Sequence, residues 1–389
     1  MKTAANLFAL VLLFAHSLTA KAQEVHAAPG QCLAYVGTYT GKAGKGIYLY
    51  QMDLQTGAFS PLGPVAETPN PAFFDLDSQG HYLFAANEIN TYQGKAAGEI
   101  SAFAIEPGTG KLTPLNQRSS MGPGPCHIVV DHDCKNALIA NYAGGSIAVL
   151  PISSDGTLSE ASTFIQFEGS SVNKARQGEP HAHCMTLDAS GRFAFVCDLG
   201  TDKIMQYRLD GEHGKLIPNE TPFLTLKPGV GPRHLTFAPN GHFAYLINEI
   251  GNSVTALAYD SEHGTLRELQ TLSTLPDDFT NRNTCAEIVV HPSGKFVYGS
   301  NRGHNSIAVF AINPAYGMLT FVERQSTGGK TPRYFTIAPG GKFLVAANQD
   351  SNNLTIFAID PDTGRLTSAG QVTDIHAPVC VKFLAVAAK

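Results

Sequence analysis

Short apolar segments alternate with glycine-rich turns along the whole chain, and this pattern repeats seven times. Each repeat opens with an apolar strand, usually after a proline, as in Cys126–Val130 or Tyr334–Ile337. A polar turn and a second strand that ends at Asn or Asp follow, and then a third strand with a period of two, as in Asn305–Ile312. A turn that contains glycine then leads to a fourth strand. Four short strands per unit predict one antiparallel propeller blade.

A turn of Gly, any residue and then Leu or Phe recurs in step with the strands. It occurs at Gly57-Ala58-Phe59, Gly110-Lys111-Leu112, Gly156-Thr157-Leu158, Gly214-Lys215-Leu216, Gly264-Thr265-Leu266, Gly317-Met318-Leu319 and Gly364-Arg365-Leu366. Successive glycines are 53, 46, 58, 50, 53 and 47 residues apart. A period of about 50 is typical of propellers and differs from the roughly 33–34 residues of helical repeats. A β-sandwich also has alternating strands, but it has no reason to repeat seven times.

The seventh repeat is divided between the two ends of the chain. Its first strand is Val379–Phe383, and the strands that complete it are Ala34–Tyr39, Gly46–Met52 and Phe59–Val65. Such a blade closes the ring and removes the open sheet edge that would invite aggregation. We therefore predict an all-β, seven-bladed β-propeller whose last blade is closed by strands from both termini. A closed ring of this kind also indicates a monomer.

The N-terminus has the features of a secretory signal peptide. Lys2 is followed by the apolar run Leu7–Leu13 and by Ala20-Lys21-Ala22, a small-x-small cleavage site. The apolar run is far shorter than the roughly 20 residues that span a bilayer. We therefore predict a signal peptide over residues 1–22, a leader over 23–31 and a single propeller domain over 32–389. Cleavage near Ala22 would leave a periplasmic or secreted protein that is not attached to a membrane.

Composition excludes several classes of protein. The 389 residues are 43% hydrophobic and 15% charged, which is too apolar for a disordered chain, and the formal charge of −5 gives no general attraction to nucleic acid. Seven cysteines without a Cys-x-x-Cys pair argue against a zinc site and a disulfide framework. Cys184 and Cys197 are equidistant from the turn at Ser190-Gly191, so they could face each other, and an oxidising compartment would permit a disulfide there.

Blade topology predicts which polar residues meet. The first strand of a blade lines the channel and the second runs antiparallel to it, so strand starts and strand ends share one rim. The residues at these positions are His127, His181, His183, Arg233, His234, Glu287, Arg333, Glu88, Tyr142, Asp198, Glu249 and Arg302. So many charges at one mouth are costly unless they bind a polar ligand or pair with one another around ordered water.

Most of these rim residues lie in segments that resemble a known family. The segments are Glu179-Pro180-His181-Ala182-His183, Asp198-Leu199-Gly200-Thr201-Asp202, Gly231-Pro232-Arg233-His234, Asn248-Glu249, Ala286-Glu287-Ile288, Asn301-Arg302-Gly303, Pro332-Arg333-Tyr334-Phe335 and Asn141-Tyr142-Ala143-Gly144-Gly145. From about Leu33 to Leu384, the chain resembles the propeller lactonases, which include bacterial 6-phosphogluconolactonases and fungal carboxy-cis,cis-muconate cyclases.

The resemblance implies a catalytic set and a supporting set. The catalytic set is His183 (with His181 as the alternative), Arg233, Glu249 and Arg302. The supporting, substrate-binding set is His127, His181, Glu287 and Arg333. In a lactonase of this kind a base activates water and guanidinium groups stabilise the oxyanion. Glu249 or His183 is the expected base, and Arg233 and Arg302 are the expected oxyanion ligands.

The expected function is therefore hydrolysis of a small, anionic sugar-acid lactone, as in 6-phosphogluconolactonase, without a cofactor. An exported enzyme is expected to favour an unphosphorylated aldonolactone. No Gly-x-Ser-x-Gly elbow is present. The carboxylates Asp198, Asp202, Glu88 and Glu249 could offer oxygen ligands to calcium, but the arginines at the same mouth argue against a metal. The alternative is a non-enzymatic periplasmic propeller that binds an anionic ligand or a partner protein.

Overall fold

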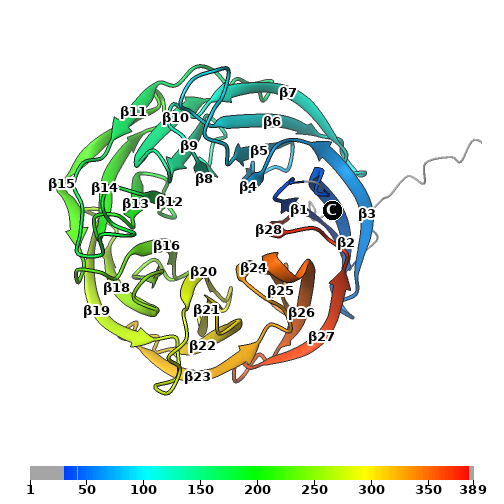
Figure 1. Cartoon of the computed structure of the whole chain (residues 1–389), viewed down its shortest axis with the longest axis vertical. Helices are drawn as coiled ribbons and strands as arrows, with labels where there is room; N and C mark the ends of the chain where they lie inside the picture. The colour runs from blue at the N-terminus through cyan, green and yellow to red at the C-terminus, as the bar shows by residue number, and fades with distance from the viewer. Residues whose placement is uncertain (1–29, 42, 385–389) are drawn as a thin grey trace, which may run out of the picture.

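Seven four-stranded antiparallel sheets surround a central channel in the computed structural model, which describes residues 30–41 and 43–384 (Figure 1). From the innermost to the outermost strand, the sheets are β4(Pro71–Leu76)–β5(Tyr82–Asn87)–β6(Glu99–Ile105)–β7(Leu112–Ser119), β8(Pro125–Val130)–β9(Asn136–Asn141)–β10(Ser146–Pro151)–β11(Thr163–Gln166), β12(Ala182–Leu187)–β13(Phe193–Asp198)–β14(Lys203–Asp210)–β15(Lys215–Thr225), β16(Pro232–Phe237)–β17(Phe243–Asn248)–β18(Ser253–Asp260)–β19(Thr265–Ser273), β20(Thr284–Val290)–β21(Phe296–Arg302)–β22(Ser306–Ile312)–β23(Leu319–Ser326), β24(Pro332–Ile337)–β25(Phe343–Asn348)–β26(Asn353–Ile359)–β27(Leu366–Thr373) and β28(Pro378–Phe383)–β1(Gln31–Thr38)–β2(Gly46–Asp53)–β3(Phe59–Glu67). The predicted seven-bladed propeller is confirmed.

The last blade joins the two ends of the chain, as predicted. Strand β28 pairs antiparallel with β1, with Ala34 opposite Phe383 and Val36 opposite Val381. Strand β1 begins at Gln31, the last residue of the predicted leader. The predicted signal peptide lies outside the described residues. No helix in the described part of the chain is long and apolar enough to cross a membrane.

The repeated Gly-x-Leu turn is where neighbouring blades are joined. Tyr245 on β17 donates its hydroxyl to the carbonyl of Gly317 in the next blade, at 3.0 Å. Gly317 has a φ of +69°, and a Cβ there would lie 2.3 Å from the ring of Phe243. Glycine is therefore required both for the left-handed backbone and for the close approach. The Leu319 side chain that follows is buried between the blades.

Buried asparagines at the ends of the second strands hold the rim in place. Asn141 donates to the carbonyl of Ser120 at 2.9 Å, Asn301 to that of Thr274 at 3.2 Å and Asn348 to that of Thr327 at 3.3 Å. Each of these carbonyls belongs to the segment that enters the same blade from the previous one. The amide therefore ties the end of the second strand to the start of the first, which brings the two predicted rim positions together.

The two cysteines singled out in the sequence face each other across a strand pair. Cys184 on β12 is the direct partner of Cys197 on β13, which confirms the predicted juxtaposition. Both side chains are buried, and both are free thiols in this structure.

Candidate functional site

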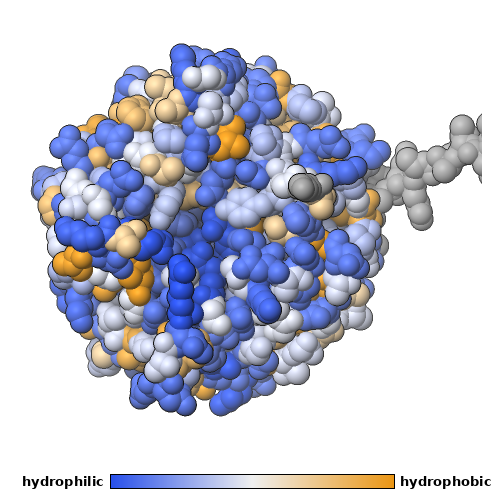
Figure 2. All heavy atoms as spheres, viewed as in Figure 1, coloured by the Kyte–Doolittle hydropathy of each residue, from blue (hydrophilic) through white to orange (hydrophobic). Residues whose placement is uncertain are grey.

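One mouth of the channel gathers the charged residues predicted from the blade topology. Arg233 lies near the start of β16, Glu249 directly follows β17 and Arg302 ends β21. Hydrophilic side chains line the depression at the centre of the ring in the surface view (Figure 2). Since the strands belong to a rigid ring, the mouth holds these groups without needing a flexible loop.

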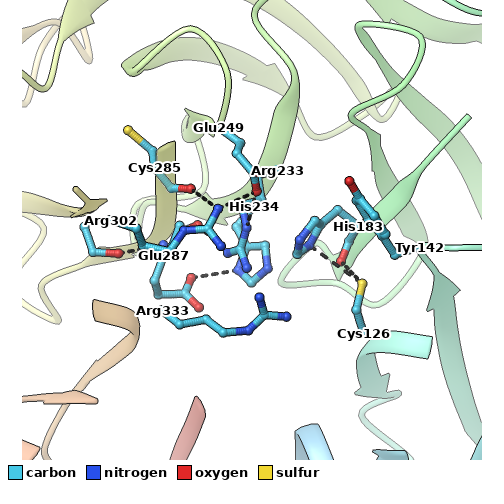
Figure 3. A network of polar contacts seen from close by, with 12 residues as sticks. Cys126, Tyr142, His183, Arg233, His234, Glu249, Cys285, Glu287, Arg302 and Arg333 are labelled. Carbon is cyan, nitrogen blue, oxygen red and sulfur yellow. Dashed lines mark hydrogen bonds and ion pairs between the residues drawn. The ribbon is translucent and has the colours of Figure 1, made fainter. Parts of the chain in front are cut away.

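Glu249 is the centre of the cluster because three arginines bind its carboxylate, and Figure 3 labels two of them, Arg233 and Arg302. Its Oε2 lies 2.9 Å from Arg233 Nε and 2.8 Å from Arg302 Nη2, and its Oε1 lies 2.5 Å from Arg176 Nη2. The Arg233 N–H is not aligned with Oε2, so this contact is an ion pair rather than a hydrogen bond. Both carboxylate oxygens are therefore occupied by guanidinium groups.

The arginines also bind carbonyl oxygens, which sets their orientation. Arg233 donates to the carbonyl of Ala286 at 2.6 Å, and Arg302 to that of Cys285 at 2.9 Å. Burial raises the pKa of Glu249, but the three guanidinium groups outweigh burial and lower it from 4.5 to about 2. Burial, reinforced by Arg302, lowers the pKa of Arg233 to about 10. At neutral pH the carboxylate and this arginine are both charged.

His183 lies beside the arginine cluster and is buried. Burial and then the charge of Arg233 hold the pKa of its imidazole well below 6.5, so the ring is neutral at physiological pH. Its Nδ1 lies 3.8 Å from the Cys126 sulfur, which itself contacts the carbonyl of His183. The edge of the ring meets Tyr142, with the ring centroids 5.3 Å apart. The neutral imidazole keeps a lone pair that can accept a proton, while the neighbouring arginine charges oppose the positive charge that results.

A second imidazole, His234, lies beside His183, and their ring centroids are 5.1 Å apart. Its Nδ1 is 2.9 Å from Oε1 of Glu287, and both side chains are buried. On the other side, His127 meets His234 edge-on at 5.2 Å and stacks on Phe73 at 4.1 Å. Three histidines from three different blades are thus in ring contact within the channel.

The remaining predicted residues line the same mouth. Arg333 lies 3.3 Å from Oε2 of Glu88, which also accepts the Tyr39 hydroxyl at 2.5 Å. His181 stacks on Tyr142 with centroids 4.5 Å apart and contacts the Tyr142 carbonyl through Nδ1 at 3.0 Å. All eight residues expected from the sequence are therefore at or within the channel.

Asp198 has a structural role at this rim. It accepts the backbone N–H of His181 at 2.7 Å, that of Gly200 at 3.0 Å and the Thr201 hydroxyl at 2.6 Å. These bonds bind the turn after β13 to the start of the blade and occupy both oxygens of the carboxylate. No group of three or more His, Cys, Asp or Glu side chains among residues 30–41 and 43–384 could hold a metal ion.

Arg176 is the site residue that the sequence did not indicate. It lies in the segment 167–181 between β11 and β12, and besides Glu249 it donates to the Tyr142 hydroxyl at 3.2 Å. Its side chain is 31% exposed, the most exposed of the three arginines that bind Glu249. One signal was available: the interval from Gly156 to Gly214 is 58 residues, the longest in the repeat, and it contains this additional segment.

Comparisons with known proteins agree with the fold. A family model described as a lactonase, 7-bladed beta-propeller, matches residues 33–383. A 6-phosphogluconolactonase of Bacillus subtilis is 38% identical over 353 residues, which cover 90% of this chain and 98% of the relative. A 6-phosphogluconolactonase of Formosa agariphila is 33% identical over 309 residues, 78% of this chain and 85% of the relative. The structure of a periplasmic gluconolactonase from Pseudomonas aeruginosa is 33% identical with a TM-score of 0.86, and the match covers 92% of this chain and 99% of that one.

Proposed function

The chain belongs to the family of seven-bladed β-propeller lactonases, and from this premise we propose that it hydrolyses the ring ester of a sugar-acid lactone at the arginine-lined mouth of the channel. The observation that carries the proposal is the placement of a neutral imidazole, His183, beside arginines whose positions are set by one buried carboxylate. A base beside cationic groups is the arrangement that ester hydrolysis requires.

His183, rather than Glu249, is the base in this proposal. The pKa of Glu249 is about 2, and its two oxygens are already bound by three arginines, so the carboxylate has little affinity for a proton at neutral pH. Its role is to position Arg233 and Arg302. These guanidinium groups then stabilise the negative charge that develops on the carbonyl oxygen.

The proton and bond changes balance without a cofactor. His183 takes a proton from water while the resulting hydroxide forms a bond to the lactone carbonyl carbon. The carbonyl oxygen becomes an oxyanion facing the arginines. When this intermediate collapses, the bond between the carbonyl carbon and the ring oxygen breaks. The alkoxide then takes the proton that water gave to His183, which leaves the histidine neutral again, and the product is an open-chain hydroxy acid.

The charge of the mouth favours an anionic ligand or transition state. Four arginines at the mouth, Arg176, Arg233, Arg302 and Arg333, face the carboxylates of Glu88, Glu249 and Glu287. The fourth rim carboxylate, Asp198, is already occupied by hydrogen bonds from the backbone N–H groups of His181 and Gly200 and from the Thr201 hydroxyl. If the predicted signal peptide exports the protein, phosphorylated sugars are scarce around it. We therefore propose an unphosphorylated aldonolactone as the substrate, in line with the gluconolactonase from Pseudomonas aeruginosa.

A panel of lactones assayed by acid release tests this function. Purified protein is expected to hydrolyse gluconolactone faster than the spontaneous reaction, with a higher kcat/KM than for 6-phosphogluconolactone. The reverse preference would contradict the proposed substrate but support the lactonase. No hydrolysis of any member above the spontaneous rate would favour the non-enzymatic propeller that binds an anionic ligand or a partner protein.

Replacing His183 with glutamine tests the base directly. Because a positioned general base contributes roughly 10²- to 10⁴-fold, we expect kcat to fall by at least about a hundredfold with the fold intact. The matched control is His213→Gln, since His213 is an exposed turn histidine paired with Asp210 at 2.9 Å, outside the channel mouth. Full activity of His183→Gln, or an equal loss in both variants, would remove His183 from the mechanism.

A further inference from the structure

The pair formed by His234 and Glu287 is separate from the arginine cluster and equally buried. Glu287 Oε1 lies 2.9 Å from His234 Nδ1 and also accepts the backbone N–H of Ile288 at 2.9 Å. The side chains of His234 and Glu287 are only 6% and 7% exposed. His234 on β16 and Glu287 on β20, which belong to adjacent blades, thus form an imidazole–carboxylate pair inside the channel.

These contacts determine which nitrogen of His234 holds the proton. A carboxylate that receives a backbone N–H and faces Nδ1 favours the tautomer in which Nδ1 carries the hydrogen. The lone pair then lies on Nε2. This atom is buried and has no hydrogen-bond partner among the described residues, and neither does Oε2 of Glu287. A buried, oriented and unoccupied acceptor is unusual unless a proton or ligand reaches it.

His234 is also placed next to the proposed base. Figure 3 shows its ring between Glu287 on one side and His183 on the other. The other titratable or charged groups around it are His127 from β8, Cys184 from β12 and Arg233 from its own strand. Among these neighbours, Glu287 is the one whose full negative charge is hydrogen-bonded to the ring, so it is the group that stabilises an imidazolium there.

We propose that His234 is a second proton-transfer residue of the lactonase reaction and that Glu287 positions it. His183 passes the proton taken from water to His234 Nε2 through an intervening water molecule, because the two rings are in contact but Nε2 has no hydrogen-bond partner among the described residues. The ring ester bond then breaks, and the leaving alkoxide takes that proton from His234, which returns both histidines to their neutral forms. The negative charge of the Glu287 carboxylate stabilises the positively charged His234 ring between the two proton transfers. This inference rests on the proposed lactonase function.

The arginines give a physical reason for this transfer. The charges of Arg233, Arg333 and Arg302 oppose a proton on His183, whereas the charge of Glu287 favours one on His234. Burial lowers the pKa of His234 below 6.5, Glu287 acts in the opposite direction, and Arg233 lowers it further. Of the two rings, His234 is therefore better able to hold the proton between the two steps.

The pH profile of kcat in Glu287→Gln tests the proposal. Without the carboxylate, His234 protonates less readily, so the acid limb of the profile is expected to move to lower pH while the plateau falls about a hundredfold. Glu287→Asp keeps the charge and should hold the acid limb near its wild-type position. The matched control is Asp75→Asn, which removes a different channel carboxylate, one paired with Lys382 at 3.2 Å, and should leave the limb unmoved.

The outcomes separate this inference from the proposed function. A wild-type protein that hydrolyses lactones, with a folded Glu287→Gln variant whose acid limb is unchanged, overturns the role of this pair alone. A wild-type protein without activity overturns the lactonase proposal itself. If Glu287→Gln does not fold, His234→Gln gives the second test: a folded variant that retains the wild-type kcat overturns the proposal, and a loss of about a hundredfold supports it.

Discussion

Replacing Glu249 with glutamine is expected to lower both the turnover and the free energy of unfolding. Turnover should fall roughly a hundredfold or more, because Arg233 and Arg302 lose the carboxylate that positions them toward the oxyanion. The pKa shift of Glu249 from 4.5 to about 2 corresponds to about 3 kcal/mol of stability at neutral pH, at about 1.4 kcal/mol per unit. Arg233, which is 2% exposed, would be left as a buried charge without its partner. Activity assays and chemical denaturation measure the two effects.

The pH dependence of stability in Glu249→Gln gives an independent test of the role of this carboxylate. Because the pKa of Glu249 is lowered on folding, its contribution is complete above pH 4.5 and is lost as the pH falls through about 2. Wild-type protein should therefore lose stability more steeply over this range than Glu249→Gln does. Parallel curves for the two proteins would contradict the assignment of Glu249 as a permanently charged anchor.

The control for Glu249 is a carboxylate in a more exposed ion pair. Glu323, whose side chain is 16% exposed, lies 3.0 Å from Arg365, whose side chain is 57% exposed. Its Oε1 also accepts the backbone N–H of Leu366 at 2.7 Å, a bond that the amide oxygen of glutamine can keep. Exposed pairs contribute about 0–1 kcal/mol, so Glu323→Gln should change the unfolding free energy little and leave turnover unchanged. An equal loss of stability in both variants would show that the buried ion pairs of Glu249 contribute no more to the unfolding free energy than the more exposed pair of Glu323.

Ending the chain before Pro378 is expected to abolish cooperative folding. This truncation removes β28, the innermost strand of the blade that joins the termini, and leaves the edge of β1 unpaired in the channel. Val379 and Val381 are buried, and each contributes roughly 1.5–3 kcal/mol. With the lost backbone ladder, the total approaches the 5–15 kcal/mol by which domains are usually stable. Circular dichroism during thermal unfolding and light scattering would detect the broad transition and the aggregation.

A chain ended after Leu384 provides the control for this truncation. It keeps β28 and the bond from the Leu384 N–H to the carbonyl of Leu33 at 2.9 Å. This shorter chain should unfold as sharply as the full protein. A sharp transition in the chain that lacks β28 would mean that the ring does not depend on closure by both termini.

The architecture could be predicted because its causes are local and repeated. The period-2 strands, the Gly-x-Leu turns and the Asn or Asp at the end of the second strand occur in every complete repeat, and each has a direct packing reason. Gly317 must approach Phe243, and Asn141 must satisfy the carbonyl of Ser120. The antiparallel pairing of the first two strands in each blade also predicts the rim, because it brings the start of the first strand next to the end of the second.

The pairings within the rim were decided only by the tertiary structure. Arg176 meets Glu249 across 73 residues, and His234 meets Glu287 across 53, with each pair bridging different blades. A hydrophobic pattern records which face of a strand is buried, but it carries no information on which side chains from other blades converge there. The choice between Glu249 and His183 as the base has the same origin, because their pKa values depend on burial and on arginines contributed by other parts of the ring. The sequence repeat by itself therefore determined the seven-bladed ring and the position of its rim. The side-chain contacts and the pKa values at the rim depend on residues that only the folded ring brings together.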